Sequence, residues 1–97
     1  MVALKVKRPT NVTSMYAAAA QSDRLSKIQR RNCSRISETC AEHPRCRKMV
    51  EQCTLHAYER DNGPIVGAVD WQAILEWFLE NGPAIMKMIL AIIAMFG

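Results

Sequence analysis

The chain has 97 residues, of which 49% are hydrophobic and 6% aromatic, and its formal net charge is +4. This length allows one domain at most, and the hydrophobic content excludes a mostly disordered chain. The charge is unevenly divided, because residues 1–60 hold twelve Lys/Arg and five Asp/Glu whereas residues 61–97 hold one Lys and four Asp/Glu. A basic first part and an apolar, slightly acidic second part indicate two segments with different surroundings.

The first thirteen residues are predicted to form an extended basic arm. Apolar and cationic residues alternate from Val2 to Lys7, which is the periodicity of a strand, and Pro9 closes this run. A single strand is not stable alone. We therefore expect residues 1–13 to stay unstructured, to add to the edge of a partner's sheet, or to lie on an acidic surface.

Two helices are predicted next, over about 14–42 and about 44–61. Ser14 can cap the first helix, whose apolar positions recur every three or four residues. Pro44 disfavours helical geometry at His43 and suits the first position of the second helix. Because the turn at His43 is short, the two helices are predicted to form an antiparallel hairpin.

Four cysteines are placed symmetrically about the predicted turn, at positions 33, 40, 46 and 53. In an antiparallel hairpin Cys40 faces Cys46 and Cys33 faces Cys53, and facing Cα atoms can approach the ~5.5 Å that a disulfide needs. We predict these two nested disulfides, which indicate an oxidising environment if they form. One alternative is four free thiols buried between the helices. A zinc site is disfavoured because seven helical residues separate two Cα atoms by about 10 Å.

This layout resembles the twin-cysteine helical hairpins of the mitochondrial intermembrane space. Those proteins also join two antiparallel helices with nested disulfides. The resemblance covers residues 33–53 only, and the cysteine spacing differs from that of the family. It therefore implies a common architecture and carries no functional residue over to this chain.

The first helix is also predicted to carry a basic face, which consists of Arg24, Lys27, Arg30, Arg31 and Arg35. A stripe of cations on a helix can bind nucleic-acid phosphates or anionic lipid headgroups, and it is most often a solvated helix face. Four glutamates dilute the stripe and no aromatic residues interleave with it. Nucleic acid is therefore the least favoured of these partners.

A linker over 63–69 leads into an apolar helical tail over 70–97. Asp70 can cap a helix to about residue 80, and Asn81-Gly82-Pro83 separates it from a helix over about 83–96. Fourteen helical residues reach about 21 Å, which is short of the ~30 Å hydrocarbon core of a bilayer. We expect lipid, a partner or the chain itself to cover the apolar face, whose members are Trp71, Ile74, Phe78, Ile85, Ile89, Leu90, Ile92, Ile93 and Phe96.

The predicted fold class is therefore all-α, and no motif for catalysis is present in the sequence. We predict a non-enzymatic protein without catalytic residues, cofactor, metal site or small-molecule substrate. The predicted function is that of a structural or accessory subunit of a complex or virion, with protein partners or self-association through the apolar helix pair and the basic arm and hairpin. The first alternative is a small membrane-active or membrane-anchored protein, holin-like or interfacial. The second alternative is a basic accessory protein that binds nucleic acid.

Overall fold

The computed structural model describes residues 8–96, and within that range all regular structure is helical. The prediction of an all-α fold is confirmed. Most of the predicted basic arm, residues 1–7, lies outside the described residues. The five helices are α1 (Val12–Ala19), α2 (Lys27–Glu42), α3 (Pro44–Asn62), α4 (Trp71–Asn81) and α5 (Pro83–Ala94).

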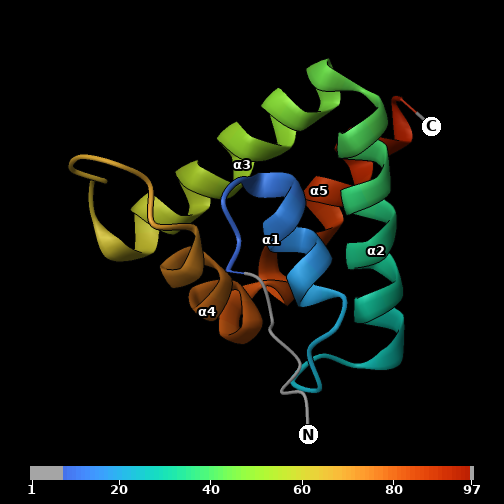
Figure 1. Ribbon diagram of the computed structural model, residues 1–97, viewed down its shortest axis with the longest axis horizontal. Helices are drawn as coiled ribbons and strands as arrows, with labels where there is room; N and C mark the ends of the chain where they lie inside the picture. Colours follow the sequence, from blue (N-terminus) through green and yellow to red (C-terminus); the bar gives the residue numbers. More distant parts are fainter. Residues whose placement is uncertain (1–7, 97) are drawn as a thin grey trace, which may run out of the picture.

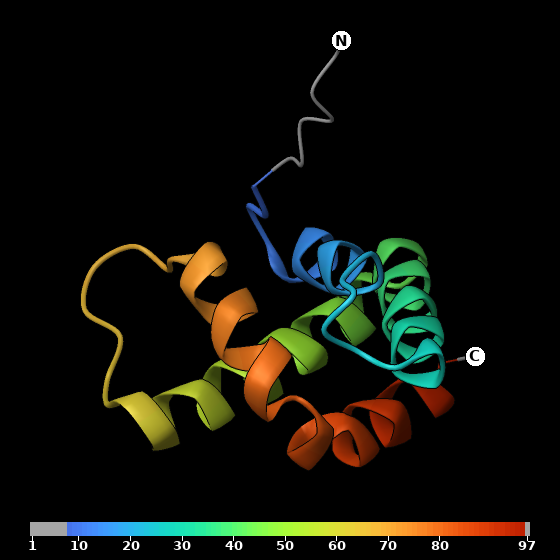
Figure 2. The same ribbon diagram turned by 90° about the horizontal axis from the view of Figure 1, so that it is seen from below.

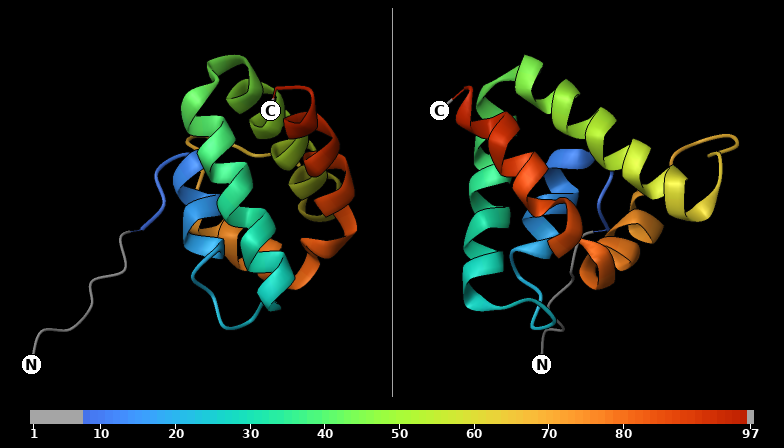
Figure 3. Two further views of the ribbon diagram at one scale, coloured as in Figure 1. Left: turned by 90° about the vertical axis from the view of Figure 1, so that its right-hand side faces the viewer. Right: turned by 180° about the vertical axis from the view of Figure 1, so that it is seen from behind.

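Helices α2 and α3 form a V whose corner is at His43, and the other helices pack around this V (Figure 1). Helix α1 lies on one face of the V and α5 crosses the opposite face, as the views from the right-hand side and from behind show (Figure 3). Helix α4 packs against α1, α3 and α5 at the open end (Figure 2). The apolar faces of all five helices therefore meet in one core.

Local sequence explains where α1 and α2 begin. Asn11 caps α1 and exchanges hydrogen bonds with Ser14, because each side chain accepts from the backbone N–H of the other residue. Ser26 and Gln29 form the same reciprocal capping box at the start of α2. Each box satisfies backbone N–H groups that have no partner inside the helix. Two separate helix starts are therefore built into the sequence before residue 30.

The prediction of one continuous helix over 14–42 is wrong, because the chain turns between α1 and α2. Leu25 is buried in this turn, directly before the cap at Ser26. The turn sets α1 beside α2 instead of in line with it. The three-to-four-residue periodicity places Ile28 on the apolar side with Ile36 and Cys40, but Ile28 is 69% exposed. The buried side of α2 consists of Cys33, Ile36 and Cys40.

The later helix boundaries agree with the prediction. Pro44 and Pro83 occupy the first turns of α3 and α5, where a missing N–H costs nothing. The Asp70 side chain accepts a hydrogen bond from the Ala73 N–H at the start of α4. Gly63 ends α3 with a positive φ of 89°, a conformation that favours glycine.

Tyr16 of α1 is the polar centre of the core. Its side chain is fully buried, and its hydroxyl forms a 2.8 Å hydrogen bond with the hydroxyl of Thr54 on α3. Its ring packs edge-on against Phe78 of α4, with the ring centroids 5.0 Å apart. Burial raises the pKa of Tyr16 far above its ordinary value, so the phenol stays neutral. One side chain therefore connects three helices.

Removing either hydroxyl is expected to destabilise the fold. Tyr16→Phe leaves the buried Thr54 hydroxyl without its partner and should lower the free energy of unfolding by about 1–3 kcal/mol. Thr54→Val should act similarly. The double variant should lose less than the sum of the two single losses, because no unpaired hydroxyl remains. Urea denaturation of the four proteins measures these values, and strictly additive losses would contradict a direct hydrogen bond.

Candidate functional site

The two predicted disulfides are absent from the structure, in which Cys33, Cys40, Cys46 and Cys53 are free thiols. The predicted hairpin of α2 and α3 with its turn at His43 is present, and Cys40 lies beside Cys46 near this turn, but neither predicted pair is bonded. Helices α2 and α3 diverge from their corner, and α1 packs against both of them (Figure 1). A divergent pair of helices separates facing positions increasingly with distance from the corner. The alternative of four free thiols in the core describes the structure better.

Burial controls the chemistry of these thiols. It raises the pKa of Cys33 and of Cys40 to about 12, and at Cys40 the neighbouring Cys46 thiol adds to the rise. It also raises the pKa of Cys46 and Cys53. Because the thiolate is the reactive form, a buried neutral thiol is inert. Cys53 differs from the other three because its side chain is only half-buried.

The predicted partner face of the tail is mostly covered by the chain itself. Six of its members are buried in the core, namely Trp71, Ile74, Phe78, Ile85, Ile89 and Ile93. Leu90, Ile92 and Phe96 are partly buried against the same core. The sequence left lipid, a partner or the chain itself as the contact for this face, and the chain's own helices bury most of it. A partner could reach the buried members only if the fold opened.

Length and composition give limited support to a membrane segment. Within residues 8–96, every helix is too short or too polar to cross a bilayer by itself. Helices α4 and α5 are long and apolar enough to span a bilayer only when they are taken together, and the pair is bent by 107°.

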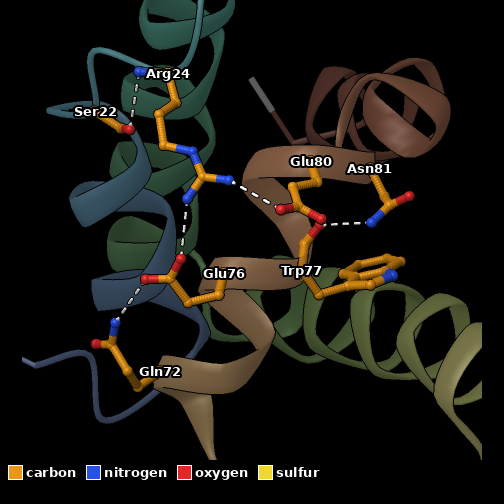
Figure 4. Close-up of polar contacts among 7 residues, drawn as sticks. All are labelled: Ser22, Arg24, Gln72, Glu76, Trp77, Glu80 and Asn81. Carbon is orange, nitrogen blue, oxygen red and sulfur yellow. Dashed lines mark hydrogen bonds and ion pairs between the residues drawn. The ribbon is translucent and has the colours of Figure 1, made fainter.

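The predicted basic face does not include Arg24. Its guanidinium forms ion pairs with Glu76 and Glu80 of α4, at 3.0 and 3.3 Å (Figure 4). Gln72 donates a further hydrogen bond to Glu76. Arg24 therefore ties the turn before α2 to α4. All three charged side chains are largely exposed, so the expected contribution to stability is small.

The other predicted basic residues remain on the surface. Lys27, Arg31 and Arg35 are exposed and Arg30 is half-buried. Helix α3 continues the basic surface with Arg45, Arg47 and Lys48, which the sequence analysis did not include. Residues 27–48 thus hold seven Lys/Arg and two Glu. We call this segment the cationic corner, because it spans α2, His43 and the start of α3.

A groove of about 460 Å³ runs between α3 and α5. Its lining includes Met49, Cys53, His56, Arg60, Met88 and Ile92. The Cys53 thiol donates to the Met88 sulfur across the groove, with 3.5 Å between the two sulfur atoms. Sequence analysis missed this site because only packing brings α5 beside α3. The one signal in the sequence was the one-turn spacing of Met49, Cys53 and His56.

Comparisons with protein-family models, with curated proteins and with solved structures found no match to this chain. The class of the protein is therefore defined by its fold, a five-helix domain with a cationic corner and a groove between α3 and α5.

Free thiols predict a specific alkylation pattern. In denaturant without reductant, iodoacetamide should modify four cysteines per chain, as it does after reduction. In the native protein Cys53 should react first, because the other three thiols are fully buried. Mass spectrometry with peptide mapping measures both results. Modification that requires prior reduction would contradict the free-thiol state.

Proposed function

We propose that this protein is a non-enzymatic accessory subunit that binds an acidic surface of a partner protein through its cationic corner. The observation that supports the proposal is that most cations form no ion pair within the described residues, whereas most acids form hydrogen bonds inside the molecule. Within residues 8–96, ion pairs involve Arg24 alone among the cations. The seven cations of the cationic corner thus have no internal counter-charge within 4 Å in this part of the chain.

The acids, by contrast, are mostly engaged inside the molecule. Five of the nine accept hydrogen bonds from the chain itself, namely Glu59, Asp61, Asp70, Glu76 and Glu80. They support the loop after α3 and both ends of α4. A surplus of five positive charges over residues 27–48 therefore faces solvent. Such a surplus favours association with negative surfaces and speeds the encounter with them.

The proposal modifies the sequence-based expectation in one respect. The apolar face of α4 and α5 is used inside the fold, so the partner is expected to meet charged surface rather than this face. The protein partner is favoured over nucleic acid because Glu38 and Glu42 interrupt the cationic corner. Phe, Tyr and Trp residues that could stack on bases are also missing from residues 27–48, and the ring of His43 already lies against Phe96.

Charge removal tests the cationic corner against a matched control. The triple variant Arg31→Ala, Arg35→Ala and Lys48→Ala should bind a fluorescent polyglutamate peptide roughly tenfold more weakly than the unchanged protein, since exposed ion pairs contribute ~0.2–1 kcal/mol each. The control variant Arg8→Ala, Arg60→Ala and Lys87→Ala removes the same charge elsewhere and should lose much less.

Fluorescence anisotropy at low and physiological salt measures both variants. Equal losses in the two variants would show a non-specific charge effect and contradict the proposal. Tighter binding of a single-stranded DNA of equal charge would favour the nucleic-acid alternative.

The membrane alternative rests on the bent pair α4–α5 and requires the core to open. Insertion would remove Phe78 and Ile89 from contact with the other helices, and both side chains are fully buried in the fold. It would also separate Tyr16 from Phe78. Membrane association through this pair is therefore in competition with folding.

Alkaline carbonate extraction tests this alternative. When membranes from cells that express the full chain are extracted, we expect the protein in the supernatant, because its apolar helices are covered by its own core. A single-span membrane protein in the same sample should stay in the pellet. Retention of this chain with that control would replace the subunit proposal by membrane anchoring through α4 and α5.

A further inference from the structure

Two sulfur atoms from different helices meet in the groove between α3 and α5. Cys53 Sγ and Met88 Sδ lie 3.5 Å apart. Two sulfurs that each bind one metal ion at about 2.3 Å are at most about 4.6 Å apart, and about 3.8 Å apart in a tetrahedral site. The pair therefore already has a separation that suits two ligands of one ion, and packing of α5 on α3 sets this separation.

The groove brings two further donors to the same place. Met49 precedes Cys53 by four residues and His56 follows it by three, so one helical turn separates each from Cys53. The corresponding rise along the axis is about 6 Å and about 4.5 Å. Side chains three or four residues apart share a helix face and can bind the same ion, so either of the two can join Cys53. Met49 and His56 themselves are seven residues, or about 10 Å, apart along the axis, and of the two the imidazole is the stronger metal ligand. Both side chains line the groove together with Cys53 and Met88.

The donor set selects the kind of metal. One thiol, two thioethers and one imidazole are soft or intermediate donors, and thiolate with thioether favours copper(I). Zinc takes cysteine, histidine and carboxylate ligands. Residues 8–96 contain no group of three or more such side chains placed to hold a metal ion. The methionine sulfurs are therefore what distinguishes this site.

The charge of the groove also favours copper(I) over a divalent ion. Copper(I) displaces the Cys53 proton to solvent, and the thiolate then neutralises the single positive charge of the ion. A neutral complex suits a mostly apolar groove that also contains the Arg60 guanidinium. A divalent ion with the same ligands would leave a net positive charge beside Arg60, which is electrostatically unfavourable.

We propose that the groove between α3 and α5 is a copper(I) site in which Cys53, Met88 and His56 bind the ion. The site is open to solvent, because Met49, His56 and Met88 are exposed and Cys53 is half-buried. The proposal goes beyond the binding of an acidic partner and uses a different surface. It also departs from the sequence-based expectation of no metal site.

The first test is an anaerobic titration of the full, reduced chain with copper(I) in the presence of a colorimetric copper(I) chelator. We expect one ion per chain. Met88→Leu should weaken binding at least about tenfold, because it removes one ligand. This change conserves volume at an exposed side chain and should leave the helical circular dichroism unchanged. Met95→Leu is the matched control, since Met95 is exposed but does not line the groove.

The buried thiols of Cys40 and Cys46, near the corner of the V, are the alternative place where copper(I) could bind. Cys53→Ala should abolish binding, whereas Cys46→Ala and Cys40→Ala should retain it. The opposite result, or an affinity that Met88→Leu does not change, would overturn the proposal. Lack of stoichiometric binding would overturn it as well.

X-ray absorption at the copper edge provides a readout that does not depend on affinity. We expect sulfur and nitrogen neighbours in the unchanged protein and loss of the nitrogen in His56→Gln. A spectrum with sulfur ligands alone in the unchanged protein would remove His56 from the site. It would also contradict the proposed ligand set.

Discussion

The buried hydroxyl of Tyr16 is the constraint on which the rest of the structure depends. A phenol in an apolar core must form a hydrogen bond, and Thr54 provides it at 2.8 Å. This contact fixes α1 against α3, while the Tyr16 ring against Phe78 fixes α4. The chain must therefore turn back after α1, and α2 and α3 must diverge enough for α1 to pack against both. Leu25 in the turn and the capping box at Ser26 are the local features that make this path possible.

The divergence of α2 and α3 has two consequences for chemistry. It places Cys33 and Cys53 out along two diverging helices, whereas Cys40 and Cys46 stay side by side near the corner as buried free thiols. It also gives α5 room to pack on the second face of the V, where its Met88 meets Cys53. The same divergence of α2 and α3 thus leaves space for α5 and for the groove between α3 and α5. The proposed soft-metal site uses Cys53, which would be unavailable in a Cys33–Cys53 disulfide, and the packing of α5 places Met88 beside its free thiol.

Apolar residues and most acids of this chain make contacts inside the fold, whereas most of its cations face solvent. Apolar residues of the tail are buried internally, and most acids hold loops and helix ends in place. The cations of residues 27–48 have no such internal role within the described residues. The outward-facing chemistry of the molecule is therefore positive charge at the corner of α2 and α3 and sulfur in the groove. The two surfaces are distinct, and each of the two proposals concerns one of them.

The sequence by itself determined the helix type, the corner at His43 and the boundaries of α4 and α5, because prolines, caps and turn residues act within a few positions. It also contained the capping box of Ser26 and Gln29, although the alanine-rich run and continuing periodicity masked this break. Only tertiary structure decided which faces are buried, that Arg24 pairs with Glu76 and Glu80, and that Met88 lies beside Cys53. These contacts join residues 35 to 56 positions apart. Their formation depends on how five helices share one core, and no local pattern encodes that arrangement.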